Sequence, residues 1–198
     1  AKPESSGALV TQSHIAKALH DLGVGQGDVM MLHCSLSKLG YVVGAERAIV
    51  EAALSTVGPT GSVVMPSFSG DLSDPAEWKY PPVPPEWIEQ IESEIPGYQP
   101  DLTPSRGLGK VAEYFRTHPD TKRSTHPQSS FSASGCYADY ILSPHDLSDR
   151  FGPQSPLARI EEYDGWIVLI GAPLNTCTIL YLAQFSRHDN NRIVRRSP

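Results

Sequence analysis

Apolar and polar positions follow two different periods along the first third of the chain, and these periods predict its elements. Apolar residues recur at helical spacing over residues 11–22 and 45–57, which is typical of amphipathic helices. Short apolar runs at 29–33 and 62–66 are bounded by turn residues, which indicates buried strands. A strand, a helix and a strand at this spacing favour a right-handed crossover between parallel strands.

Later segments continue the mixture of helices and strands. The same criteria predict helices at 107–115, 137–142, 157–162 and 175–185, and strands at 131–135 and 166–171. The run 166–171 is the most convincing buried strand in the chain. We therefore expect an α/β fold in which residues 1–198 form one domain.

Residues 69–104 interrupt this pattern with a segment rich in Asp, Pro, Trp and Glu. It contains at most one short helix, near 86–95. Long ordered loops in compact domains are usually functional, so we expect this segment to wall a pocket. Ligands of parallel sheets bind beyond the carboxyl ends of the strands, which would bring residues 33–40 and 67–74 to the same rim.

Composition narrows the class of partner. The chain has 198 residues, 16 basic and 22 acidic, with a net charge of −6, which disfavours nucleic acid and suits a cationic small molecule. Three widely spaced cysteines indicate neither a disulfide framework nor a zinc site, and a reducing cytoplasm is expected. No run approaches the ~18 apolar residues that span a bilayer, and the first residues lack a signal-peptide pattern. The sequence thus predicts a soluble cytoplasmic protein without a membrane partner.

Two loops carry groups suited to phosphate. Residues 35–40 lie between a predicted strand and a predicted helix and offer backbone amides, two hydroxyls and Lys38. Residues 103–109 are of the same type, with Arg106 able to fork onto a phosphate and Gly107 permitting close backbone approach. The alternatives are a plain turn with a serine cap and a helix start with a solvated arginine.

His126 is the strongest single candidate for a reactive group. It lies among hydroxyl residues and precedes proline, and a histidine accepts protons near neutral pH. A turn residue without function is the alternative. His33, at a strand end, fits a core histidine that fixes a neighbouring loop. No H-x-x-x-H or C-x-x-C spacing occurs, so no metal site is expected. Acidic residues of 69–104 suit ammonium groups or are simply solvated.

Taken together, the motifs resemble those of the aminoglycoside 3-N-acetyltransferases. The matching segments, in chain order, are Leu32–Gly40, Gly58–Pro66, Thr103–Gly109, Arg123–Pro127, Ser155–Leu157 and Gly165–Thr176. The resemblance implies a three-layer α/β/α sandwich with a central mixed sheet. It also implies acetyl-CoA as donor and the 3-amino group of an aminoglycoside antibiotic as acceptor.

The resemblance assigns roles by position. Coenzyme A would be held by Ser35, Leu36, Ser37, Lys38, Leu39, Gly40, Thr103, Ser105, Arg106 and Gly107. His126 would act as the general base, and Thr176 would stabilise the oxyanion. The antibiotic would contact Asp71, Asp74, Tyr80, Asn175 and Gln184.

Two departures from the family pattern keep alternatives open. Tyr181 and Gln184 occupy positions where the family usually has a histidine and a glutamate, and the chain ends short of typical members. Glutamine keeps the size of glutamate but cannot hold a cation electrostatically. The chain would then act on a different amine, or bind antibiotic or coenzyme A with weak catalysis. The oligomeric state stays open, a homodimer included.

Overall fold

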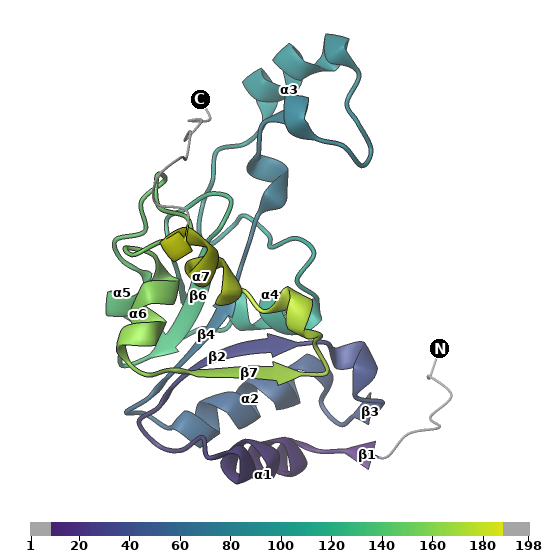
Figure 1. The fold of residues 1–198 in the computed structure, drawn as a ribbon. Helices are drawn as coiled ribbons and strands as arrows, with labels where there is room; N and C mark the ends of the chain where they lie inside the picture. The colour runs from purple at the N-terminus through teal and green to yellow at the C-terminus, as the bar shows by residue number, and fades with distance from the viewer. Residues whose placement is uncertain (1–8, 188–198) are drawn as a thin grey trace.

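A five-stranded mixed sheet forms the centre of the chain in the computed structural model, which describes residues 9–187 (Figure 1). The strands are β2 (Val29–Cys34), β4 (Ser62–Pro66), β5 (Lys122–Arg123), β6 (Phe131–Gly135) and β7 (Trp166–Ile170), in the spatial order β5-β6-β4-β2-β7. β2 runs parallel to both β4 and β7, whereas β6 is antiparallel to β4 and β5. The predicted parallel pair and the mixed sheet are confirmed.

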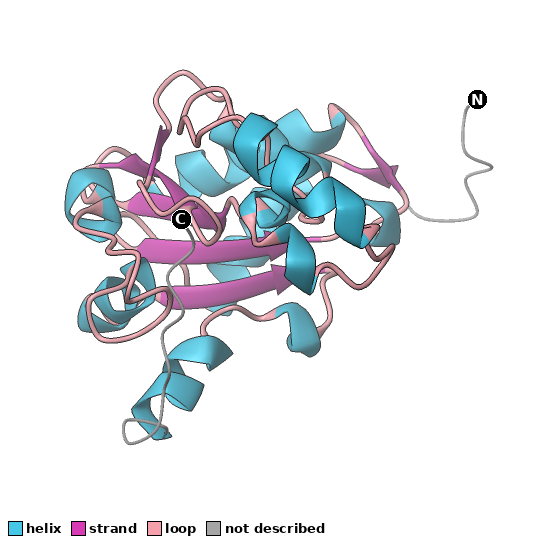
Figure 2. Cartoon of the chain, turned by 90° about the horizontal axis from the view of Figure 1, so that it is seen from above, coloured by secondary structure: helices cyan, strands magenta, loops and turns pink. Residues whose placement is uncertain are grey.

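Helices cover both faces of this sheet, so the three-layer sandwich is confirmed (Figure 2). One layer contains α1 (Gln12–Leu22), α2 (Ala45–Val57) and α4 (Lys110–Arg116). The other contains α5 (Ala138–Leu142) and α6 (Pro156–Glu162), with Leu182 of α7 (Leu180–Arg187) packed beside them. The predicted bounds of α2 and β4 agree with the structure to the residue.

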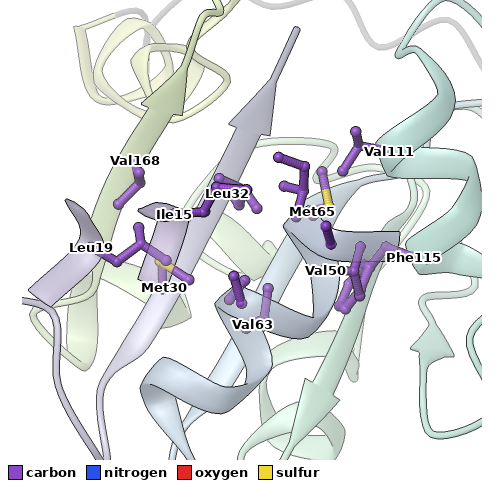
Figure 3. Packing of buried hydrophobic residues seen from close by; sticks show 14 of the residues in the cluster. Ile15, Leu19, Met30, Leu32, Val50, Val63, Met65, Val111, Phe115 and Val168 are labelled. Atoms are coloured by element: carbon purple, nitrogen blue, oxygen red, sulfur yellow. The ribbon is translucent and has the colours of Figure 1, made fainter. Parts of the chain in front are cut away.

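The two central strands send alternate side chains to the two layers. Met30, Leu32, Val63 and Met65 belong to the cluster under α1, α2 and α4 (Figure 3). Val29, Met31 and Val64 belong to the cluster under α5 and α6. Successive residues of a strand point to opposite faces, and here both faces are covered. This is why β2 and β4 are continuous apolar runs in the sequence.

The ends of α1 follow from its capping residues. Thr11 accepts a hydrogen bond from the backbone N–H of His14 at 3.3 Å, which satisfies one of the free donors of the first turn. Gly23 ends the helix with φ of 103°, a left-handed conformation that glycine adopts without strain. The predicted start and stop of this helix are therefore confirmed.

Three elements differ from the sequence prediction. β7 is an edge strand in which Val168 is the one buried residue and Trp166 is 38% exposed, because β2 pairs with it on one side only. The helix expected from residue 175 begins at Leu180, after a 3-10 turn, η5 (Leu174–Thr176). β5 was not predicted, because Lys122 and Arg123 look like loop residues.

The remaining elements are short. They are β1 (Leu9–Val10), β3 (Tyr41–Val42), α3 (Ile88–Glu94) and the 3-10 turns η1 (Leu36–Lys38), η2 (Gly70–Leu72), η3 (Pro75–Glu77) and η4 (Pro85–Trp87). α3 confirms the short helix expected near 86–95. It has no buried residue and extends away from the sheet at the top of Figure 1. No helix within residues 9–187 is long and apolar enough to cross a membrane.

Candidate active site

The turn that carries His126 lies inside the protein, although its sequence is polar. His126 is 3% exposed, and Ser124, Ser129 and Ser130 are also buried. The turn joins β5 to β6, and it extends the pairing of β6 with β4 beyond the end of β4. Ser67 N–H donates to the Ser130 carbonyl at 2.9 Å, and Ser69 N–H donates to the Gln128 carbonyl at 3.2 Å. His126 therefore lies near the carboxyl end of a central strand.

Arg123 ties this turn to both ends of segment 69–104. Its guanidinium donates to the Ser69 hydroxyl at 2.7 Å, the Ser130 hydroxyl at 3.0 Å and the Pro100 carbonyl at 3.2 Å. It also donates to the carbonyls of Ser67 and Thr103. A planar cation with five N–H donors satisfies acceptors from several chain segments at once. The geometry of the turn thus depends on one half-buried arginine.

A second histidine, His145, anchors the other side of the turn. Ser124 Oγ lies 2.9 Å from His145 Nδ1 and accepts from the Phe131 N–H at 2.9 Å. His145 Nε2 lies 3.0 Å from the Arg150 carbonyl, and Arg150 Nε donates to the Ser129 hydroxyl at 2.8 Å. Burial lowers the pKa of His145. Nothing in the sequence around His145 marks it as a neighbour of His126, so it was not predicted as a site residue.

The His126 ring is held by its own turn. Its Nδ1 accepts hydrogen bonds from the backbone N–H groups of Gln128 and Ser129, both at 3.2 Å. Its ring centroid lies 4.9 Å from that of His145. Burial, with the nearby charges of His145 and Arg150, lowers the pKa of His126 to about 4. Its Nε2 is buried and has no hydrogen-bond partner in the described part of the chain.

The first predicted coenzyme loop, residues 35–40, packs against the end of β7. Ser35 N–H donates to the Ile170 carbonyl at 2.9 Å. Gly171 has φ of 67°, and a Cβ added there would lie 3.0 Å from Ser35 O and from Lys38 Cβ. Only glycine fits such a contact without displacing the loop. Ser37, Lys38 and Gly40 are exposed, so they are accessible to a ligand.

His33 is a buried residue at the same edge of the sheet, next to the loop 35–40. It is 6% exposed, and its Nε2 accepts from the Thr178 N–H at 3.4 Å, which joins the end of β2 to the start of α7. Burial lowers its pKa to about 4. The core-histidine interpretation is confirmed.

The second predicted coenzyme loop is partly occupied by internal bonds. Ser105 donates its N–H and its hydroxyl to Glu113, at 2.9 and 2.6 Å. Burial by itself would raise the pKa of the Glu113 carboxyl, but hydrogen bonds from Arg116 and Ser105 outweigh it and hold that pKa at about 2. Arg106 is exposed and pairs with Asp71 at 2.7 Å. The structure thus joins a predicted coenzyme residue to a predicted antibiotic residue.

The other predicted contact residues lie at the surface or in local turns. Asp74 caps η3 by accepting from the Ala76 N–H at 2.8 Å, and Thr176 donates to the Pro173 carbonyl at 2.7 Å. The exposed side chains are Tyr80, Asn175 and Gln184. In the described residues the His126 side chain makes hydrogen bonds only within its own turn. None of these five residues is bonded to it.

Tyr181 occupies a position where the family usually has a histidine. A cluster of aromatic rings connects it to the neighbourhood of His126. Its ring stacks on Phe151 at 4.8 Å with 12° between the planes. Phe151 also packs at 5.7 Å from Phe68 and 6.3 Å from Phe131, and the Phe131 ring lies 5.9 Å from His145. The Tyr181 ring thus contributes to the packing of this cluster. The described residues contain no group of three or more His, Cys, Asp or Glu that could hold a metal.

The comparison with known families decides the identity of this arrangement. Residues 31–197 match the family model described as aminoglycoside 3-N-acetyltransferase. The chain belongs to this family. The predicted membership is thereby confirmed over most of the sequence.

Individual relatives within this acetyltransferase family cover nearly the whole chain. It is 39% identical, over 94% of its length, to the SPbeta prophage-derived aminoglycoside N(3')-acetyltransferase-like protein YokD of Bacillus subtilis (strain 168). It is also 39% identical, over 91% of its length, to aminoglycoside N(3)-acetyltransferase VIII of Streptomyces fradiae. The chain spans 68% and 63% of the lengths of these two relatives.

Solved structures of other members share the fold. The crystal structure of YokD superposes with a TM-score of 0.86 at 40% identity, covering 89% of this chain and 70% of that one. AAC-IIIb in binary complex with CoASH superposes with a TM-score of 0.76 at 34% identity, covering 89% of this chain and 65% of that one. The antibiotic N-acetyltransferase type of sandwich is therefore confirmed.

Proposed function

We propose that the protein transfers an acetyl group from acetyl-CoA to the 3-amino group of an aminoglycoside antibiotic. The observation that carries the proposal is the state of His126, which resembles the family's catalytic histidine. It is a buried imidazole fixed by backbone N–H groups of its own turn, and its Nε2 has no partner among residues 9–187. A buried polar group without a partner is costly unless a ligand uses it. Family membership supplies the reaction class.

Coenzyme A would bind along the two loops at the carboxyl ends of the strands. Lys38 and Arg106 are exposed cations suited to its phosphates, and a Cβ added at Gly107 would meet nothing within 4 Å, so the backbone there is open to a ligand. The AAC-IIIb complex with CoASH supports coenzyme binding on this fold. These residues fit the co-substrate. Ser105 would contribute less than expected, because Glu113 already accepts from its hydroxyl.

The antibiotic would be recognised by carboxylates of segment 69–104. Asp71 is exposed and Asp74 is half-buried. Their charges complement the ammonium groups of an aminoglycoside, as does the net charge of −6. Asp71 would have to leave Arg106, and a phosphate bound to Arg106 would release it. Tyr80, Asn175 and Gln184 would line the same surface, with segment 69–104 as the pocket wall expected from the sequence.

At the reacting centre the amine nitrogen attacks the thioester carbonyl. His126 was expected to act as general base and Thr176 to donate to the oxyanion. A base at Nε2 requires that this nitrogen lacks a proton. Three unpaired cysteines, Cys34, Cys136 and Cys177, suit the reducing cytoplasm, where we place the protein.

The test is an acetyltransferase assay with acetyl-CoA and a panel of aminoglycosides, in which free thiol is followed and the product is identified by mass spectrometry. We expect thiol release that depends on the antibiotic, and a mass gain of one acetyl group at the 3-amino nitrogen. His126→Ala should reduce turnover by ~10²-fold or more while binding coenzyme A normally. Thiol release that ignores the antibiotic would contradict the proposal.

A second candidate function is sequestration of antibiotic or coenzyme A with weak catalysis. The observation that favours it is Gln184, which cannot supply the negative charge of the usual glutamate. Calorimetry that detects tight binding without thiol release would support this candidate. A large gain of turnover in Gln184→Glu would show that a charge essential to transfer is missing. Transfer to an amine of another class remains testable in the same assay with other acceptors.

A further inference from the structure

The hydrogen bonds of His126 fix the position of its proton. Nδ1 lies 3.2 Å from two backbone nitrogens, those of Gln128 and Ser129, and both donate to it. A backbone N–H only donates, so Nδ1 must present a lone pair and carries no proton. The neutral ring therefore has its proton on Nε2. This is the opposite of the tautomer that a base acting through Nε2 requires.

The neighbouring histidine cannot exchange a proton with His126. The Arg150 carbonyl only accepts, so His145 Nε2 is the donor in that bond. Ser124 Oγ accepts from the Phe131 N–H, and its own proton is directed to His145 Nδ1. Both nitrogens of His145 are thus engaged with groups other than His126. The two rings lie 4.9 Å apart, and among the described residues no hydrogen bond joins them.

The surroundings also keep His126 neutral. Burial lowers its pKa to about 4, His145 and Arg150 act in the same direction, and Asp146 acts in the opposite direction with a smaller effect. Protonating the ring would place a proton on Nδ1 between two N–H donors, which would repel it. The buried Nε2–H has no partner within the described residues. A ligand oxygen that reaches this nitrogen would supply the missing acceptor.

We propose that His126 acts as a hydrogen-bond donor, through Nε2–H, to the carbonyl oxygen of the acetyl thioester, and not as a general base. The inference rests on the proposed acetyl transfer. Backbone N–H groups that face one nitrogen of a histidine keep the ring neutral and leave the proton on the other nitrogen for a carbonyl, and His126 has that arrangement. Donors aimed at a developing oxyanion stabilise it without reorganisation.

The electrons and protons of the step balance without a protein base. The neutral amine attacks the carbonyl carbon, the C–N bond forms, and the C=O π electrons move to the oxygen that His126 Nε2–H contacts. The C–S bond then breaks and its electron pair leaves on sulfur. The proton lost by the amine nitrogen ends on the coenzyme thiol, and His126 keeps its own proton throughout.

The tautomer is tested directly by long-range ¹H–¹⁵N NMR on the ligand-free chain labelled with ¹⁵N, from pH 6 to pH 8. We expect the Nδ1 resonance of an unprotonated nitrogen and the Nε2 resonance of a protonated one, assigned by their loss in His126→Gln. The reversed pattern would overturn the donor role. This readout needs no activity, so it remains interpretable if the chain transfers no acetyl group.

The catalytic role is tested by comparing His126→Gln with His126→Ala. The side-chain amide of glutamine donates a hydrogen bond near the position of Nε2 but cannot act as a base at neutral pH. We expect His126→Gln to retain at least ~10-fold more turnover than His126→Ala, since loss of one such donor costs about 10²–10³-fold. Equal turnover of two folded variants that bind coenzyme A normally would overturn the donor role. Absence of transfer in the unaltered chain would contradict the proposed function itself.

Discussion

The turn that carries His126 and the segment 69–104 are both polar in sequence, yet the protein treats them in opposite ways. Ser129 and Ser130 are fully buried, and His126 is 3% exposed. In the segment, Tyr80 is 98% exposed and α3 buries no residue. The difference teaches that the residue proposed for chemistry is held by internal hydrogen bonds, whereas those proposed for recognition are left accessible to solvent.

Arg123 connects the two regions. It fixes both ends of segment 69–104, so only the middle of the segment can adjust its conformation. Its guanidinium binds Ser69 at the start of the segment and the carbonyls of Pro100 and Thr103 at its end.

Further bonds hold the segment close to these points: Gln128 Nε2 donates to the Leu72 carbonyl at 3.1 Å, and the Tyr98 hydroxyl donates to the Ser124 carbonyl at 2.8 Å. Asp71 also pairs with Arg106. Between Leu72 and Tyr98 the side-chain hydrogen bonds are local, such as the bond from Trp78 Nε1 to the Ser73 hydroxyl at 2.9 Å. A segment with fixed ends and an exposed middle suits a surface that adapts to ligands of different shape.

The largest effect is expected for Arg123→Met, which removes the connection between the two regions. It removes hydrogen bonds to carbonyl and hydroxyl acceptors on three chain segments, and of these acceptors the Ser67 carbonyl keeps a bond from the Ser130 hydroxyl. We expect a loss of about 4 kcal/mol in the free energy of unfolding, measured by urea denaturation.

The matched control for this variant is Arg106→Met. Its ion pair with Asp71 leaves both side chains largely exposed, so the expected loss is at most about 1 kcal/mol. If the two arginine variants lost equal stability, the contrast between a buried network and an exposed segment would be wrong.

The second largest effect is expected on lowering the pH, which should reduce the free energy of unfolding through the buried histidines. The pKa of His33 and that of His126 are each lowered from 6.5 to about 4 by burial. Between pH 6.5 and pH 4 the unfolded chain binds protons that the folded chain does not, so stability falls as pH is lowered and is unchanged above this window. By pH 5 each histidine should cost roughly 2 kcal/mol.

Denaturant curves at pH 8 and pH 5 measure this dependence, and His126→Gln serves as the control. The variant lacks one of the buried histidines whose pKa is lowered, so its stability should fall less between the two pH values. A variant that loses as much stability on acidification as the unaltered chain would show that His126 is not held neutral.

A smaller loss is expected for Ser124→Ala. The Ser124 hydroxyl joins the Phe131 N–H to His145 Nδ1, and its removal leaves both without their buried partner. We expect about 1–2 kcal/mol of destabilisation. Ser93→Ala is the control, because the Ser93 hydroxyl bonds the Gln90 carbonyl on exposed α3 and should matter by less than about 0.5 kcal/mol. Thermal melting of both variants decides between these values.

The smallest effect is expected from the coupling between Asp71 and Arg106. A double-mutant cycle of Asp71→Asn and Arg106→Met should give an interaction energy below about 1 kcal/mol, because both side chains are solvated. Salt should reduce it further. A coupling energy of several kcal/mol would mean that the pair is a structural link and not an exchangeable contact.

Much of the fold was predictable because the apolar composition of the two central strands, β2 and β4, indicates that they are buried. The bounds of α2 and β4 followed from periodicity and from the glycines between them. The edge position of β7 was not predictable, since an apolar run does not tell whether one or two strands pair with it. The start of α7 was misplaced because residues 175–178 look like a cap but form a 3-10 turn and its exit.

The site was predictable only in part. His126 was found from its composition and from the family resemblance, but the polar sequence around it did not show that the structure would bury it. Burial of the turn depends on contacts made far along the chain, by Arg123 with 69–104 and by His145 with Ser124. The hydrogen bonds of a side chain are likewise absent from a linear pattern, so the tautomer of His126 required the fold.

Steady-state kinetics of two variants tests the division of labour between these regions most directly. With saturating acetyl-CoA and a varied aminoglycoside, His126→Ala should lower kcat by ~10²-fold or more with little change in KM. Asp71→Asn should raise KM with kcat nearly unchanged, because it removes a contact made equally before and during the reaction. The reverse assignment, with His126 acting on KM and Asp71 on kcat, would contradict the account.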